Sequence, residues 1–156
     1  MVKIVNYILV LFIISSNAYA LEPGKWSFVQ EDEYCYIGSL ATETDLPENK
    51  IRGDNYILVY RIIGSDQNIV QIEAGYDYNT EKNILVKIDN TDFDFYTVED
   101  SPDSAWTDDD NKVIYAMKKG LSLIITGESS RGTITNDSYS LNGFTAAFND
   151  LVNECK

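Results

Sequence analysis

The stretch YILVYRIIGSDQNIVQIEA, Tyr56 to Ala74, decides the fold class of this chain of 156 residues. Its first part, Tyr56 to Ile63, is apolar on both faces apart from Arg61, which is typical of a central β-strand. Gly64 to Asn68 provides turn residues, and apolar and polar side chains then alternate from Ile69 to Ala74, as in a half-buried strand. The stretch therefore predicts two antiparallel strands joined by a short turn.

Short strands separated by polar turns continue along most of the chain. Six further strands are predicted, at Trp26 to Val29, Tyr34 to Ile37, Ile84 to Ile88, Asp92 to Phe95, Leu121 to Ile125 and Ile134 to Leu141. In the last of these, Tyr139 and Leu141 are out of phase with Ile134. A bulge or bend near Asn136 and Asp137 is therefore predicted, because it would keep all three apolar side chains inside.

Two short helices complete the predicted secondary structure. The segment Glu99 to Asn111 is interpreted as a loop, and Lys112 to Lys119 follows it with apolar residues at helical spacing. Gly120 comes directly after this helix, as expected of a C-terminal cap. Near the end of the chain, Phe144 to Val152 repeats apolar residues at spacings of three and four, and Cys155 falls on the same face. Many short strands with two helices favour an all-β fold, specifically an antiparallel β-sandwich.

The first twenty residues have the features of a secretory signal peptide. A short positive start is followed by an apolar run, Ile4 to Ile14, and by the small-x-small pattern Ala18-Tyr19-Ala20. Cleavage near Ala20 would leave residues 21–156 as a single domain without a second hydrophobic span, located in the periplasm or secreted. An uncleaved N-terminal anchor is the alternative.

The charge of the chain limits its partners. Its formal net charge is −13, and removal of residues 1–20 would leave eleven basic and twenty-five acidic residues, a net charge of −14. Binding to nucleic acid or to anionic membranes requires a cationic face, so neither is expected to be a partner. A basic protein partner is compatible with this charge.

The chain has two cysteines, Cys35 and Cys155. Export through an oxidising compartment favours a disulfide between them, with a pair of free buried thiols as the alternative. The spacing does not fit a CxxC redox motif, and two thiols without histidine do not form a structural zinc site. The sequence therefore predicts one disulfide, no bound metal and no cofactor.

The loop TGESSRGT, Thr126 to Thr133, has the composition of a reactive site but lacks the partners of one. The chain contains no histidine, which excludes Ser-His-Asp and Cys-His catalysis. The loop also departs from G-x-S-x-G and is expected to run from strand to strand. Gly127 and Gly132 are expected to supply backbone angles that other residues resist. Arg131 is expected to pair with a nearby carboxylate.

Two other groups of residues are candidate sites. Asp108, Asp109 and Asp110 are consecutive, so they are interpreted as a helix cap with solvated neighbours, and a metal site is the alternative. Tyr76 and Tyr78, together with Arg131, form the candidate interaction surface, because tyrosine combines apolar area with a polar tip. The alternative is that these tyrosines simply pack and cap strands at the sheet edges.

Lys119-Gly120 comes before a predicted strand, and SLNGFTAA, Ser140 to Ala147, stands at the entry to a predicted helix. With these motifs the chain resembles the invasion-associated locus B family of bacterial exported proteins over essentially all of residues 21–156, most strongly from Ala105 onward. An early tryptophan followed by a cysteine, here Trp26 and Cys35, also fits the family pattern. Many members carry another cysteine pair ahead of the Lys-Gly, which is absent from this chain.

The resemblance implies an immunoglobulin-like β-sandwich, a periplasmic or surface location and, in some pathogens, a link to host-cell invasion. It implies no known enzyme activity. We therefore expect an exported, non-catalytic interaction or envelope-associated protein whose partner is a protein of the host surface or of the bacterial envelope. The alternatives are a periplasmic accessory or binding module with a bacterial partner and, less favoured, a carboxylate-dependent hydrolase with two acids converging in a cleft.

Overall fold

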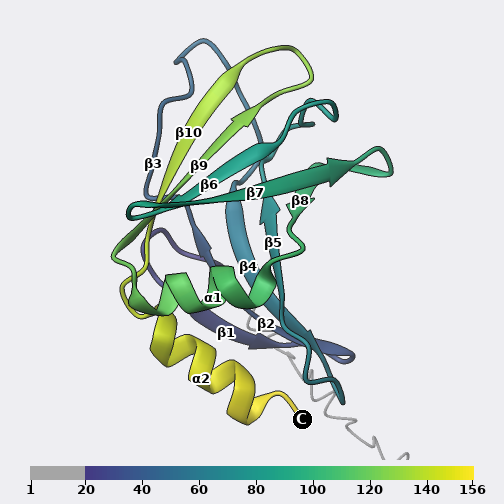
Figure 1. Cartoon of the computed structure of the whole chain (residues 1–156), viewed down its shortest axis with the longest axis vertical. Coiled ribbons are helices and arrows are strands. Elements are labelled where there is room, and N and C mark those ends of the chain that lie inside the picture. Colours follow the sequence, from purple (N-terminus) through teal and green to yellow (C-terminus); the bar gives the residue numbers. More distant parts are fainter. Residues whose placement is uncertain (1–19) are drawn as a thin grey trace, which may run out of the picture.

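The computed structural model describes residues 20–156, so the predicted signal peptide lies outside the described residues except for Ala20. The described chain is mostly β, with two helices (Figure 1). Its strands are β1 (Ser27–Gln30), β2 (Tyr34–Leu40), β3 (Glu43–Thr44), β4 (Tyr56–Ile62), β5 (Ile69–Glu73), β6 (Ile84–Ile88), β7 (Thr91–Val98), β8 (Ser101–Trp106), β9 (Ser122–Glu128) and β10 (Ile134–Ser140). The helices are α1 (Asp110–Lys119) and α2 (Phe144–Glu154). Within residues 20–156, neither helix has the length and apolar character needed to cross a bilayer.

All ten of these strands belong to one antiparallel sheet, in the order β1-β2-β4-β5-β8-β7-β6-β9-β10-β3. The prediction of an all-β fold with two short helices is confirmed at this level. The structure does not show the two separate sheets of an immunoglobulin-like sandwich. The physical reason is β8, which pairs with β5 through Ala105 and with β7 through Trp106 and so joins the two halves of the sheet.

The interpretation of Glu99 to Asn111 as a loop is wrong for β8. The strand has the sequence SPDSAW, in which proline, aspartate and serine all have low strand propensity. Its pairing is also short, with two residue pairs to β5 and two to β7 around an irregularity. Only its position between two longer strands makes this segment extended.

The sheet curves strongly, so that its two ends face a single core (Figure 1). The indole Nε1 of Trp26, which lies just before the edge strand β1, donates a hydrogen bond to the carbonyl oxygen of Ser140 in β10 at 2.9 Å. Buried side chains from both halves, such as Val59 in β4 and Leu123 in β9, belong to one hydrophobic cluster. The layer predicted as a second sheet is therefore provided by the far half of the same sheet.

The lower end of the molecule in Figure 1 is closed by α2. Phe144, Phe148 and Leu151 are buried, as the helical spacing predicts, whereas Val152 is 39% exposed. The disulfide between Cys35 in β2 and Cys155 after α2 is present, so the predicted pairing is confirmed. We call this part of the molecule, formed by α2, the disulfide and the strands beneath them, the closed end.

The predicted bulge in β10 is wrong. β9 and β10 pair over seven consecutive residues without a shift of register. Ile134 is 59% exposed, whereas Thr135 and Asp137 are buried on the same face of the strand as Tyr139. The prediction failed because it placed every apolar residue inside and did not allow for polar residues facing inward.

Candidate functional site

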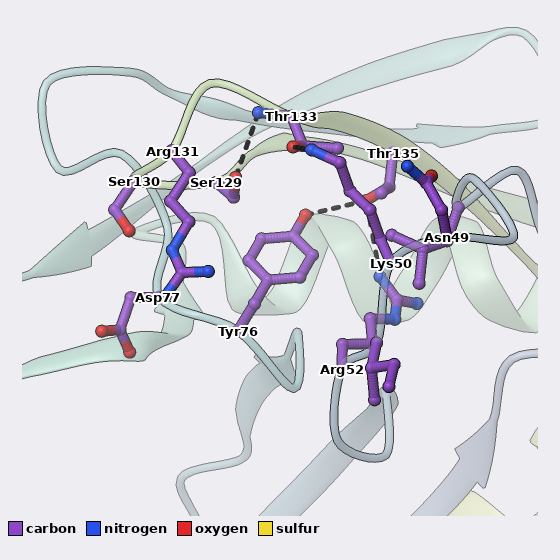
Figure 2. A pocket seen from close by; sticks show the side chains of 12 residues that line it. Asn49, Lys50, Arg52, Tyr76, Asp77, Ser129, Ser130, Arg131, Thr133 and Thr135 are labelled. Atoms are coloured by element: carbon purple, nitrogen blue, oxygen red, sulfur yellow. Dashed lines mark hydrogen bonds between the residues drawn. The ribbon is translucent and has the colours of Figure 1, made fainter.

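A pocket of about 640 Å³ lies at the end of the molecule opposite α2 (Figure 2). Three segments form it: the loop before β4, the residues after β5 and the connection between β9 and β10. The lining residues are Leu46, Asn49, Lys50, Ile51, Arg52, Tyr76, Asp77, Ser129, Ser130, Arg131, Thr133 and Thr135. The pocket thus combines elements from both halves of the curved sheet.

Two glycines bring the first two of these segments together. The backbone N–H of Gly53 donates to the carbonyl oxygen of Gly75 at 2.9 Å. Gly75 has a φ of 70°, in the left-handed region, and a Cβ atom built there would lie 2.3 Å from the Gly53 oxygen. A larger residue at position 75 would therefore push the loops apart and separate Arg52 from Tyr76.

A buried ion pair forms the inner wall of the pocket. Arg52 Nη2 lies 2.6 Å from Asp137 Oδ1, and each of the two side chains is 6% exposed. Arg52 Nη1 also donates to Thr135 Oγ1 at 3.4 Å, and the guanidinium lies 5.5 Å from the centre of the Tyr76 ring. Because a buried charge is costly unless it is paired, these contacts fix the position of Arg52.

Tyr76 and Tyr78 have different places in this site. The Tyr76 hydroxyl lies 2.8 Å from Thr135 Oγ1 and borders the pocket, whereas Tyr78 is 3% exposed and packs edge-on against Tyr76 with ring centres 5.3 Å apart. Burial raises the pKa of both phenols, so both stay protonated near neutral pH. Of the three predicted surface residues, Tyr76 and Arg131 border this pocket, and Tyr78 lies beneath it because it packs against Gly127.

The two glycines of TGESSRGT have different functions. Gly132 has a φ of 82°, as predicted for a residue that supplies an unusual backbone angle. Gly127 has no positive φ, so that part of the prediction is wrong. A Cβ atom at Gly127 would instead lie 2.5 Å from a ring carbon of Tyr78. Gly127 therefore makes room for the buried tyrosine.

The connection between β9 and β10 uses its polar groups internally. The Ser129 hydroxyl accepts a hydrogen bond from the Thr133 N–H at 3.1 Å, and Ser129 is 8% exposed. The Ser130 N–H donates to the carbonyl oxygen of Asp77 at 2.7 Å, which ties the connection to the residues after β5. The hydroxyl of Ser129 thus closes a turn.

Arg131 lies exposed at the rim of the pocket. Figure 2 shows its side chain directed toward Asp77. Within residues 20–156, the ion pairs shorter than 4.0 Å are Lys25–Glu22, Arg52–Asp137 and Lys112–Asp109. The predicted pairing of Arg131 with a carboxylate is therefore not found at ion-pair distance.

Sequence reasoning missed Lys50 and Arg52, both of which line the pocket. Lys50 Nζ donates to Thr133 Oγ1, which closes one side of the pocket mouth. Of the three residues Arg52-Gly53-Asp54, Gly53 and Asp54 are exposed, whereas the Arg52 side chain is turned inward and paired with Asp137. One feature of the sequence did point to this ion pair. The alternation of side chains in β10 turns Asp137 inward, and a buried carboxylate requires a cation beside it.

The acidic tract Asp108 to Asp110 lies elsewhere, at the start of α1. Asp109 occupies the N-cap position without a side-chain cap and pairs with Lys112 Nζ at 2.6 Å, so the capping interpretation is wrong for it. Asp110 Oδ1 accepts the Val70 N–H at 2.7 Å, and burial raises its pKa. Within residues 20–156, no three of the residues His, Cys, Asp and Glu are grouped in a way that could hold a metal ion.

Comparison with known proteins agrees with this fold. A crystal structure of invasion associated protein B from Bartonella henselae superposes with a TM-score of 0.59 at 16% sequence identity, covering 83% of this chain and 93% of that chain. No curated protein sequence matches the chain. The family profile described as "Invasion associated locus B (IalB) protein" matches residues 28–152. Because this match covers most of the chain, the protein belongs to the invasion associated locus B family.

Proposed function

We propose that the protein is an exported, non-catalytic interaction protein that binds its partner at the pocket formed by the loop before β4, the residues after β5 and the β9–β10 connection. The observation that carries this proposal is the buried Arg52–Asp137 pair behind an open pocket whose lining includes many polar and charged side chains. A buried ion pair adds little stability compared with apolar packing, so its position behind a pocket favours a role in shaping a binding site.

Export is the second part of the proposal. The disulfide between Cys35 and Cys155 is typical of proteins that fold in an oxidising compartment. The family description and the signal-like residues 1–20 agree with a periplasmic or secreted protein cleaved near Ala20. The link to host-cell invasion that the family description carries is part of this proposal for the chain.

The chemistry of the pocket supports binding. The chain has no histidine, the Ser129 hydroxyl accepts a backbone hydrogen bond and Asp137 is neutralised by Arg52. Asp77 is the one acidic residue among the pocket-lining residues, whereas a carboxylate-dependent hydrolase needs two convergent acids. These features favour recognition over bond cleavage.

Site-specific crosslinking in living cells tests this proposal. A photoreactive residue at Ser130, on the pocket rim, is compared with one at Asn149, which is exposed on α2 at the other end of the molecule. We expect one protein to be captured from position 130 and not from position 149. Capture of a host surface protein or of a bacterial envelope protein distinguishes the two kinds of partner. Identical capture from both positions, or none from position 130, contradicts the proposal.

A further inference from the structure

The pocket differs in charge from the rest of the chain. The whole sequence has 12 basic and 25 acidic residues, yet the pocket lining has three basic residues, Lys50, Arg52 and Arg131, against the single carboxylate of Asp77. Behind the lining, the charge of Arg52 is balanced by Asp137. Counted over the lining residues alone, the remaining charges of Lys50, Arg131 and Asp77 leave an excess of one positive charge. A ligand with one negative charge would neutralise this excess.

The two rim cations are placed to hold such a group. Figure 2 shows Arg131 and Lys50 on either side of the Tyr76 ring, with Arg131 directed toward Asp77 and Lys50 Nζ bonded to Thr133 Oγ1. Both residues are exposed, so they can meet a ligand without the cost of breaking a buried ion pair. An arginine and a lysine on either side of a carboxylate provide charge-assisted hydrogen bonds.

The other polar groups of the pocket fit a ligand that carries hydroxyl groups. Tyr76, Ser130, Thr133 and Asn49 contribute three hydroxyls and an amide to the lining. Each of these groups both donates and accepts hydrogen bonds, so they can pair with the hydroxyls of a sugar. The phenol of Tyr76 remains protonated near neutral pH because burial raises its pKa.

The size and charge of the pocket favour a small ligand with one negative charge. Its volume of about 640 Å³ falls within the range of roughly 300–1,000 Å³ found for small-molecule sites. The strongly negative chain repels polyanions such as nucleic acids, and the nearby Asp77 disfavours a doubly charged phosphate. A small ligand with a single carboxylate and several hydroxyl groups fits both the volume and the charge of the pocket.

We propose that this pocket binds an acidic sugar, with Arg131 and Lys50 holding its carboxylate and the hydroxyl-bearing side chains holding its ring hydroxyls. This inference rests on the proposed interaction function and specifies its ligand. An acidic sugar of this kind can be part of a glycan carried by a protein partner or of a bacterial surface polymer.

Calorimetric titration of the signal-free, disulfide-bonded protein with a galactose trimer in which one unit is galacturonic acid tests the inference, because this acidic trimer carries a single carboxylate. The matched ligand is the neutral galactose trimer, and poly-glutamate serves as the acidic peptide. We expect binding of the acidic trimer only, and at least a fivefold loss of affinity for Arg131→Gln and for Lys50→Gln. Lys112→Gln removes an exposed lysine outside the pocket and is expected to leave affinity unchanged.

Each other outcome overturns the inference. Equal binding of the neutral trimer would show that the carboxylate is not recognised, and equal binding of poly-glutamate would show that charge alone is recognised. Absence of binding, or an equal loss of affinity in Lys112→Gln, would also refute the inference. Failure here is distinguishable from failure of the proposed function, because crosslinking from position 130 reports a bound partner whichever of its chemical groups occupies the pocket.

Discussion

The closed end and the pocket end belong to one sheet but are built in opposite ways. At the closed end, Phe144 and Leu151 are fully buried, and the Cys35–Cys155 disulfide joins β2 to the residue after α2. At the pocket end, the inward positions of β10 are polar, and Asp137 requires the guanidinium of Arg52. Burial of apolar area stabilises the closed end, whereas buried polar pairs give the pocket end a defined shape at little gain in stability. The difference places stability at one end and, under the function that we propose, recognition at the other.

Truncation of the closed end should have the largest effect. Phe144 is fully buried and its ring packs edge-on against Trp26 with ring centres 4.8 Å apart. We expect Phe144→Ala to lower the free energy of unfolding by about 3–5 kcal/mol, through lost burial and the cavity left behind. Val152→Ala on the same helix is the control, because Val152 is 39% exposed, and its cost should stay below about 1 kcal/mol. Denaturant unfolding measures both, and equal losses would show that this helix face is peripheral.

Removal of the disulfide should have the next largest effect. Cys35 and Cys155 are 120 residues apart in sequence, so the crosslink restricts most of the unfolded chain. The double variant Cys35→Ala/Cys155→Ala should lose about 2–4 kcal/mol of unfolding free energy, the usual range for a disulfide. Reduction of the wild-type protein provides a second measurement of the same loss. If both treatments leave stability unchanged, the packing of α2 alone holds the closed end.

Disruption of the ion pair tests the pocket end. Asp137→Ala leaves the Arg52 charge without its partner. Breaking a fully buried ion pair in this way lowers the free energy of unfolding by about 3–5 kcal/mol. Because water can reach Arg52 through the pocket, we expect a smaller loss here, of about 2–3 kcal/mol.

The double variant Arg52→Met/Asp137→Ala removes both charges and should be more stable than Asp137→Ala alone. Denaturant unfolding of these two variants and of the single variant Arg52→Met completes the mutant cycle. If the double variant is less stable than Asp137→Ala, the ion pair contributes stability in the same way as the closed end. The comparison between the two ends then fails.

The smallest expected effect is the pH dependence of the stability that Asp45 contributes. The Asp45 carboxylate accepts hydrogen bonds from the side chain and the backbone N–H of Asn136, which lower its pKa below the ordinary value. Because the folded pKa is the lower one, this stabilisation is fully present above the unfolded pKa of about 3.9 and is lost as the pH falls through the folded pKa. Asp45 is exposed, so we expect Asp45→Ala to cost less than about 1 kcal/mol at pH ~6 and almost nothing at pH ~2. Urea unfolding at both pH values measures this difference, and an equal cost at both would contradict the assignment.

Local patterns predicted the closed end well. The spacing of Phe144, Phe148 and Leu151 identifies the buried face of α2, because side chains three and four residues apart share one face of a helix. The number of cysteines and the expected export were sufficient to predict the disulfide. Apolar alternation was equally sufficient for β5, where Val70 and Ile72 are buried. In β4 the strand itself was predicted, but Arg61 is buried and Ile62 is 54% exposed.

The same patterns failed where the structure uses polar residues inside. Asp137 and Arg52 are separated by 85 residues, so neither one identifies its partner in the sequence. The alternation in β10 did indicate an inward aspartate, but the preference for burying Ile134 overrode it. β8 was missed for a related reason, since SPDSAW becomes a strand only through hydrogen bonds to β5 and β7.

The sequence by itself determined the chemistry of the chain: its acidity, its cysteine pair, its lack of histidine and the apolar faces of its main strands and helices. Tertiary structure alone decided that the strands form one curved sheet and that Lys50, Arg52, Tyr76 and Arg131 meet at one pocket. The physical reason is the separation in sequence of the groups that interact. Periodicity reports which side of a local element avoids water, whereas a buried charge pair or a bridging strand depends on groups brought together only after the chain has folded.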